Sequence, residues 1–435
     1  MPRDSESTRE DHVKGEENID PAGGPVPASA EPAGTMTTTT AATAATPTTS
    51  TSTSTSPSRS FSALVNSYNT STLHPPPDIP KLSLIERYLH LTALTPTTFT
   101  NTYAFLKVAA ARGIYGGEII GQCIVAAAAT VAEAFWLHSM HSYFVLPGDP
   151  KIPITYEVTN VRTGRSFATR EVKALQRGQP IAVLMASFQR PPAPSKNRAV
   201  PEWQIAMPEV PKPWELPSEQ DKIKQAEAAL ASLCDSIAQK KMADPGDPSI
   251  ATDEATLSSA YAALRRRMLR RERDPFEWRA LKSSHAPTDA HSARKVRYWV
   301  RARESLSPTI SHVQHAALAY LTDNWFIGTV SRVNPAAISE KNLAMMVSLD
   351  HTVYFHLGPD TRVDAPGDHG WLLAEMDAPW VAHERGVVTQ RIWRVSDGRL
   401  VATCFQEGLI RLKDSNSIGQ GSEDGVRGSR KSSKL

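Results

Sequence analysis

The stretch GGEIIGQCIVAAAA, at residues 116–129, sets the fold of the first half of this chain. Apolar or small residues occupy nearly every position, so no face of a helix built from it would be polar. Such a pattern predicts a helix that is buried on all sides. The glycines and alanines would let this helix approach a sheet closely.

Strand-like runs follow this helix, with hairpin turns expected at residues 162–164 and 177–179. The runs are 139–146, 154–161, 166–174 and 180–188. A helix followed by an antiparallel meander is an α+β unit.

A second unit repeats the first. An alanine-rich apolar helix is predicted over 311–328, and a hairpin turn over 396–398. The strands predicted after this helix are 344–355, 371–377, 386–395 and 400–407. Two short echoes support a duplication, His141-Ser142-Tyr143-Phe144 against 351–355 and Ala186-Ser187-Phe188-Gln189 against 403–406. Paired halves of this kind can join their sheets around two buried helices.

Composition divides the rest of the chain. Residues 1–78 are rich in Thr, Ser, Ala and Pro and are expected to be disordered. The globular units are expected at 79–195 and 291–413, joined by a linker and polar helical insertion at 196–290. A polar, disordered tail is expected at 414–435.

Charge and cysteine usage exclude several classes of protein. Lys and Arg number 48 against 45 Asp and Glu, a formal net charge of +3, which argues against wholesale nucleic-acid binding. Three widely spaced cysteines with no CxxC pair argue against a disulfide framework and a zinc site. No window approaches eighteen apolar residues and the N-terminal residues lack an apolar core, so neither a membrane span nor a secretory signal is expected.

The tripeptide Ser433-Lys434-Leu435 is the peroxisomal targeting signal. It predicts the peroxisomal import receptor as a partner and the peroxisomal matrix as the location.

Two polar residues stand out on physical grounds. Asp323 falls inside the second predicted apolar helix, where an ionised carboxylate is costly unless it is paired. Gln406 ends a predicted strand, where its amide can donate and accept hydrogen bonds. Taken singly, each is more often structural, as a cap of a loop or a closure of a sheet edge.

Motifs in both halves resemble the acyl-CoA thioesterase II family, which includes peroxisomal members. In the first half they are 116–122, 138–144, 147–149, 162–170 and 186–189. In the second half they are 320–323, 348–351, 355–356, 385–386, 397–398 and 406–408. The resemblance implies a double hot-dog fold of the α+β class, with an acyl-CoA substrate and no metal or redox cofactor.

The family's catalytic trio is an Asp on the second central helix, a Ser or Thr two residues before Asp-His, and a Gln before Glu-Gly. By resemblance these are Asp323, Ser348 and Gln406. The resemblance implies that Asp323 accepts a proton from a water molecule oriented by Ser348 and Gln406, without a covalent acyl-enzyme. Backbone N–H groups near the start of a central helix are candidates for stabilising the oxyanion.

Neighbouring residues are assigned other roles. Asp350 and His351 are adjacent in a predicted strand, so they point to opposite faces and are read as structural support rather than as part of a triad. The first half carries 126–130 where the second helix has its acid, so one active site per chain is expected. Cys123 and Cys404 lie in apolar runs and are expected to be core thiols.

Two other classes of protein remain open: a different hot-dog enzyme such as a hydratase or dehydratase, and a non-catalytic acyl-CoA-binding protein. Two segments, 357–370 and 205–290, look longer than is usual in the family. The dense basic run at 265–271 is typical of a solvated helix face, with a contact to phosphates of coenzyme A or of a partner as the alternative. The family resemblance is also compatible with a homo-oligomer.

Overall fold

The computed structural model describes residues 65–67, 82–105, 113–191, 201–282, 285–286, 288–307, 311–339, 341–364 and 367–414. These residues all belong to one compact unit. The predicted disordered arm lies outside this set except for residues 65–67. The tail beyond residue 414, with its targeting tripeptide, also lies outside it.

The first half is a helix and a meander, as predicted. Short elements precede the central helix: β1 (Val65–Ser67), α1 (Leu84–Leu89), β2 (Leu91–Thr95) and β3 (Thr98–Asn101). The central helix α2 (Gly116–Ala128) is buried from Gly117 to Ala128. The meander consists of β4 (Trp136–Phe144), β5 (Thr155–Thr163), β6 (Phe167–Gln176) and β7 (Gln179–Gln189). Arg177 and Gly178 both have positive φ, which makes the predicted turn between β6 and β7 a tight one.

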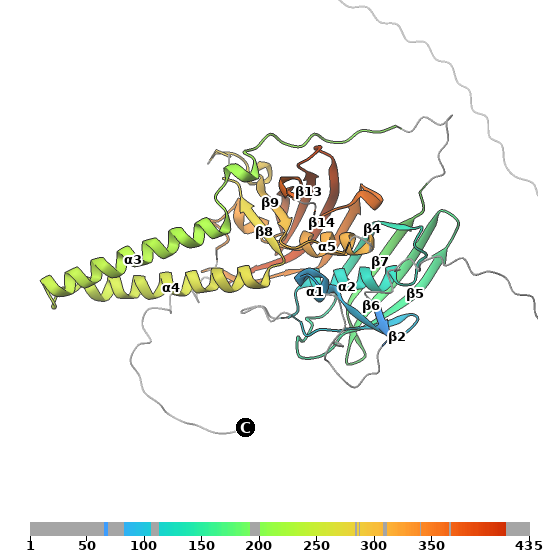
Figure 1. Ribbon diagram of the computed structural model, residues 1–435, viewed down its shortest axis with the longest axis horizontal. Helices are drawn as coiled ribbons and strands as arrows, with labels where there is room; N and C mark the ends of the chain where they lie inside the picture. The colour runs from blue at the N-terminus through green and yellow to red at the C-terminus, as the bar shows by residue number, and fades with distance from the viewer. Residues whose placement is uncertain are drawn as a thin grey trace, which may run out of the picture. The chain divides into compact units, whose positions relative to one another are not determined.

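The insertion forms a helical hairpin. A short 3₁₀ turn, η2 (Pro213–Glu215), leads into α3 (Glu219–Ala243), and α4 (Ser249–Arg273) returns alongside it. Ser218 caps α3 by accepting from the N–H of Asp221. A small apolar cluster of Ile223, Leu230 and Leu264 holds the two helices together. Figure 1 shows the hairpin projecting from the sheet.

The second half repeats the plan of the first. Its elements are β8 (Phe276–Ala280), η3 (His291–Ala293), β9 (Val296–Ala302), the central helix α5 (Ser311–Thr322), α6 (Thr329–Val333), β10 (Leu343–Ser348), β11 (Asp350–Phe355), η4 (Gly358–Asp360), η5 (Gly367–Gly370), β12 (Leu372–Ala382), β13 (Arg385–Arg394) and β14 (Leu400–Leu412). No helix in the described part of the chain combines the length and the apolar composition needed to cross a bilayer.

The two halves share one continuous sheet. Its strand order is β1-β2-β3-β5-β6-β7-β4-β11-β14-β13-β12-β9-β8, with β10 paired to β14. The junction is the antiparallel pair β4–β11, in which His141 lies opposite Thr352. The central helices α2 and α5 pack against each other beside this junction (Figure 1). They run antiparallel, because Gly117 lies against Tyr320 and Gly121 against Ala316.

The structure corrects the predicted end of the second central helix. A helix was expected over 311–328, but α5 ends at Thr322 and Asp323 follows its last residue. Trp325 adopts φ 64°, a left-handed conformation that an α-helix cannot continue through. Apolar periodicity does not register this break, because Phe326 is also buried.

Two further boundaries differ from the sequence prediction. The strand expected over 344–355 is two strands, β10 and β11, separated at Leu349, whose N–H donates to the carbonyl of Glu407. β8 lies before the boundary expected at residue 291, yet it pairs with β9 in the second half's sheet.

The repeat is real, but its register is not the one that the sequence echoes suggest. His141 lies opposite Met185 on β7, and Thr352 lies opposite Phe405 on β14. Pairing His141 with Thr352, which lie opposite each other at the junction, also aligns Tyr143-Phe144 with Tyr354-Phe355, so we take these residues as counterparts under the repeat. Met140 is therefore the counterpart of His351, and Ala186 that of Gln406. In this alignment the Tyr-Phe pairs of the first echo coincide but its histidines are one residue apart, and the second echo is three residues out.

Candidate active site

Asp323 lies where the end of α5 meets the start of α2. Its Oδ2 accepts a hydrogen bond from the backbone N–H of Gly117 (2.8 Å), and its Oδ1 accepts one from Nε2 of Gln406 (2.7 Å). The acid belongs to the second half and the N–H to the first. Both halves therefore build the site.

Two glycines at the start of α2 make this approach possible. A Cβ on Gly116 would lie 2.8 Å from Oδ2 of Asp323 and 2.8 Å from Cζ of Phe144. A Cβ on Gly117 would lie 2.5 Å from the carbonyl oxygen of Tyr320. Both separations are too short for non-bonded atoms, so any larger residue would push the two helix ends apart.

His351 fixes the orientation of the Gln406 amide. The Thr322 hydroxyl donates to the carbonyl of Ala319 (2.8 Å), so its oxygen accepts from Nε2–H of His351 (2.8 Å). The unprotonated Nδ1 of His351 then accepts from Nε2 of Gln406 (3.1 Å). With its Nε2 directed at both Asp323 and His351, Gln406 has its carbonyl Oε1 on the other side. That oxygen is buried and has no hydrogen-bond partner among the described residues.

Ser348 lies on the same face of the sheet as Gln406. It stands opposite Gly408 in the β10–β14 pair, and Gly408 is two residues along β14 from Gln406. Alternate residues of a strand share a face, so both side chains point to the helix side. Within the described residues, Ser348 makes no direct hydrogen bond to Asp323 or Gln406. The structure therefore brings Asp323 and Gln406 into contact. Ser348 lies on the neighbouring strand, diagonally across from Gln406.

Burial dominates the electrostatics of the site. It raises the pKa of Asp323 above its ordinary value, and the hydrogen bonds from Gln406 and Gly117 offset part of this shift. Burial also lowers the pKa of His351 to about 3, so this imidazole is neutral at physiological pH. A carboxylate with a raised pKa is better matched to accepting a proton near neutrality.

The remaining candidates lie outside this network. Asp350 is directed away from His351 and accepts from the N–H of Glu407 (2.6 Å), as expected for a structural residue. Cys123 and Cys404 are fully buried in the core. Burial raises the pKa of both thiols, which disfavours the nucleophilic thiolate.

Two groups in this site have roles that the sequence did not predict. Backbone N–H groups near the start of a central helix are candidate oxyanion donors from the sequence, and one N–H at such a start, that of Gly117, donates to Asp323. The role of Thr322 was not foreseen. The Thr-Asp pair at the end of an alanine-rich helix was the only signal for it, because it places a hydroxyl one residue before the acid.

The chain matches two family models. Residues 107–189 match the acyl-CoA thioesterase N-terminal domain, and residues 245–410 match the acyl-CoA thioesterase C-terminal domain. Acyl-coenzyme A thioesterase 8 from Homo sapiens is 34% identical over 342 residues, which cover 78% of this chain and 92% of the human protein. Peroxisomal acyl-coenzyme A thioester hydrolase 1 from Saccharomyces cerevisiae is 26% identical over 369 residues, covering 76% of this chain and 95% of the yeast protein.

A solved structure agrees with these matches. The crystal structure of the acyl-CoA thioesterase II TesB2 from Mycobacterium marinum superposes with a TM-score of 0.53 at 25% identity, covering 76% of this chain and 98% of that one. The fold, the site and the matches define a double hot-dog enzyme of the thioester hydrolase class. The chain belongs to the acyl-CoA thioesterase II family.

Proposed function

We propose that this protein hydrolyses fatty acyl-CoA to a free fatty acid and coenzyme A by direct attack of water, with Asp323, Ser348 and Gln406 as the catalytic residues. The observation that carries the proposal is the carboxylate of Asp323, held by Gln406 and Gly117 between the two central helices. A hydrolase needs a fixed base of this kind beside the reacting carbonyl.

In the proposed reaction, the water oxygen bonds to the thioester carbon while Asp323 takes one proton from the water. The tetrahedral intermediate then collapses, the carbon–sulfur bond breaks, and the thiolate of coenzyme A receives the proton from Asp323. The products are the fatty acid and free coenzyme A, and the carboxylate is regenerated. No acyl group becomes attached to the protein.

Gln406 and Ser348 orient the water in this proposal. The buried Oε1 of Gln406 offers an acceptor for one water proton, and the acid accepts the other. Diagonal neighbours on adjacent strands lie about 7–8 Å apart, a gap that one bound water can bridge between side chains that lean together. His351 acts as a positioning residue, because it contacts Gln406 and not the water.

We also propose a peroxisomal location. The yeast relative carries "peroxisomal" in its name, and the chain includes the tripeptide Ser433-Lys434-Leu435. A fluorescent protein fused ahead of the chain should colocalise with a peroxisomal marker and lose that pattern when the tripeptide is deleted. An unchanged pattern would refute this assignment.

The activity is tested by thiol release. The purified protein is incubated with saturated acyl-CoA of several chain lengths and with enoyl-CoA, and free coenzyme A is followed with a thiol reagent. The proposal requires free coenzyme A from the saturated substrates. Hydration of enoyl-CoA without thiol release would instead establish a hydratase, and tight binding without either reaction would establish a binding protein.

A further inference from the structure

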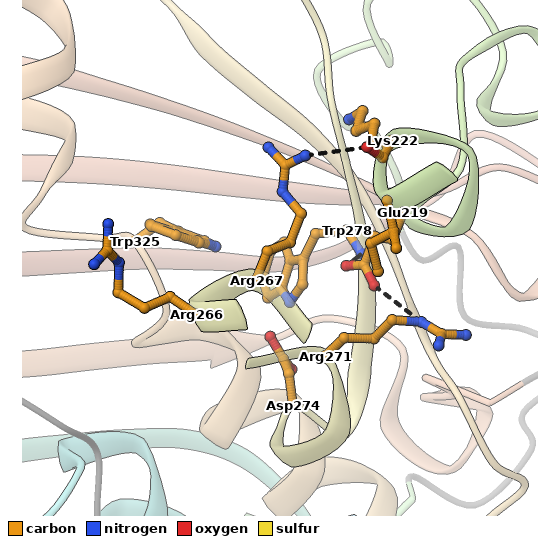
Figure 2. Close-up of a pocket in the computed structure, with 9 residues that line it drawn as sticks. Glu219, Lys222, Arg266, Arg267, Arg271, Asp274, Trp278 and Trp325 are labelled. Carbon is orange, nitrogen blue, oxygen red and sulfur yellow. Dashed lines mark hydrogen bonds and ion pairs between the residues drawn. The ribbon is translucent and has the colours of Figure 1, made fainter. Parts of the chain in front are cut away.

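A cavity lies between the base of the α3–α4 hairpin and the second half of the molecule. Its volume is about 430 Å³, within the range in which ligand pockets occur. Four cations and two indole rings line it: Lys222, Arg266, Arg267, Arg271, Trp278 and Trp325. Figure 2 shows these side chains around the cavity, with Arg266 beside the ring of Trp325. Three arginines of the basic run thus line this cavity, while each side chain also remains exposed to solvent.

The cavity carries an excess of positive charge. Two carboxylates, Glu219 and Asp274, also line it. Glu219 is paired with Arg303, which is not among the lining residues, and also with Arg271, which is, so two cations compensate its charge. The side chains of Lys222 and Arg266 make no hydrogen bond or ion pair within the described part of the chain. They are available to an anionic ligand.

The aromatic walls add a second kind of recognition. Trp278 is 8% exposed, and its buried Nε1–H has no acceptor among the described residues. Trp325 presents its ring at the opposite side of the cavity from Lys222 (Figure 2). Tyr298 and Arg332 already contact the Trp325 ring, so a flat aromatic base would pack against the part of this indole that remains exposed, while arginine forks bind phosphate groups. Together they match an aromatic base that carries phosphates.

The cavity adjoins the active site. Trp325 is two residues from Asp323, so their Cα atoms are at most about 7.6 Å apart. Burial raises the pKa of Tyr115 well above its ordinary value, and the charges of Asp323 and of Asp274 add to that shift. A single buried phenol therefore lies within electrostatic range of both the proposed base and a wall of the cavity.

We propose that this cavity binds the phosphorylated adenine nucleotide of coenzyme A, with Arg266, Arg267 and Lys222 contacting phosphates and the tryptophans contacting the base. This rests on the proposed function, because it assigns the nucleotide end of the same substrate. The pantetheine arm then leads past Trp325 to the thioester at Asp323. Lys222 lies in the stretch between residues 189 and 245 that neither family model matches, whereas the arginines and tryptophans lie within the matched C-terminal domain.

The test compares two substrates that differ only in the nucleotide. The KM of the double variant Arg266→Gln, Arg267→Gln and of the wild type is measured with an acyl-CoA and with the matching acyl-pantetheine. The subsite predicts that the KM for acyl-CoA rises at least about tenfold more than the KM for acyl-pantetheine. Equal changes for the two substrates would overturn the assignment.

Arg265→Gln is the matched control. Arg265 is adjacent on α4, and its substitution removes one positive charge against the two that the double variant removes. It lines a separate groove with Leu257, Tyr261 and Met268. Its KM for acyl-CoA should stay at the wild-type value. A rise as large as that of the double variant would mean that net charge, and not this cavity, attracts the substrate.

Binding without turnover separates this proposal from the proposed function. Calorimetric titration of the full chain with coenzyme A and with adenosine 3′,5′-bisphosphate should show binding that the double variant weakens at least about tenfold. Such binding in a protein that releases no thiol would refute the thioesterase and support the subsite. Turnover with binding that the double variant does not weaken would do the reverse.

Discussion

The two central helices end in similar ways but lead to different chemistry. At the end of α5, the Thr322 hydroxyl donates to the carbonyl three residues back, and at the end of α2 the Thr130 hydroxyl does the same. The next residue is Asp323 in one case and Val131 in the other. We call the end of α5, which carries the proposed base, the catalytic end, and the end of α2 the closed end.

The partners of the two threonines differ in the same sense. At the catalytic end, Thr322 accepts from His351, which in turn accepts from Gln406. Their counterparts in the first half, Met140 and Ala186, are a fully buried apolar pair. The second half thus has a chain of hydrogen bonds through His351, and the first half has an apolar contact in the same place.

The closed end is held by Arg170. This buried guanidinium donates to Oγ1 of Thr130 (2.8 Å) and to its carbonyl (2.9 Å), at the C-terminal end of α2 where a cation is favoured. It also donates to Oδ1 of Asn160 and to the carbonyl of Arg162. The comparison teaches that one backbone plan carries the proposed base at one end and a buried arginine network at the other, and that a few side chains make the difference.

The largest expected effect comes from removing the base. Asp323→Asn keeps the size of the side chain but cannot accept the water proton, so kcat should fall about 10²–10⁴-fold. The measurement is thiol release at saturating acyl-CoA. Asp350→Asn is the control, because it alters a nearby carboxyl group that is directed away from His351. Full turnover by the Asp323 variant would end the proposal that the catalytic end is a general-base site.

The next largest effect is expected when His351 and Gln406 are replaced by the residue types of their first-half counterparts, Met140 and Ala186. The double variant His351→Met, Gln406→Ala should fold, because Met140 and Ala186 already pack this way in the first half. Its kcat should fall about 10²–10³-fold, as for loss of an oriented hydrogen-bonding group. Melting temperature and thiol release are measured together.

The control for this exchange lies on the opposite face of the same strands. His141→Met with Thr352→Ala removes a solvent-facing imidazole and hydroxyl from the junction. Turnover should stay close to that of the wild type. If the control loses as much activity as the interior exchange, disturbance of the sheet and not loss of the relay is responsible.

At the closed end the expected loss is one of stability. Arg170→Met leaves the Thr130 carbonyl and Asn160 without their donor and should lower the free energy of unfolding by about 3 kcal/mol. Urea denaturation measures this loss. The kcat of the folded variant should remain near the wild-type value, and a fall in kcat comparable to that of Asp323→Asn would erase the distinction between the ends.

The smallest effect per residue is a dependence of stability on pH. Burial lowers the pKa of His351 and of His312 to about 3 each, against 6.5 in the unfolded chain. A depressed histidine pKa means that the unfolded state takes up the proton first, so stability is intact above pH 6.5 and is lost as pH falls toward 3. Each histidine should cost about 2 kcal/mol at pH 5.

Unfolding curves at pH 7.5 and pH 5.0 test this dependence. The difference between the two pH values should shrink by about 2 kcal/mol in His351→Met. Asp323 acts in the opposite direction, since its pKa is raised, and the Asp323→Asn protein allows the two contributions to be separated. A pH dependence that His351→Met leaves unchanged would show that this imidazole is not buried neutral.

Much of the fold follows from periodicity. The helix at 116–128 and the meander after it were predictable, because apolar runs of helical length and alternating strands leave a strong local pattern. The break after Thr322 was not, since it depends on the left-handed conformation of Trp325 and not on apolar content. The alignment of the two halves was also hard to predict. The histidines of the first echo lie one residue out of alignment, and the second echo lies three residues out.

The site was predictable in part. The resemblance to the family named Asp323, Ser348 and Gln406, and the contact between the first and last of these exists in the structure. The relay through His351 to Thr322 needed coordinates, because it joins a helix end to a strand 29 residues later. The role of Arg170 likewise depends on six hydrogen bonds that no local sequence pattern predicts.

The shared β4–β11 junction has an evolutionary consequence. If the two halves were separate polypeptides that met along this edge, they would form homodimers as well as heterodimers. Only the heterodimer would bring Gly117 at the start of α2 to Asp323. Covalent fusion makes every assembly a mixed one. A single carboxylate per chain is therefore enough to give every molecule this contact between the halves, and the first half needs none of its own.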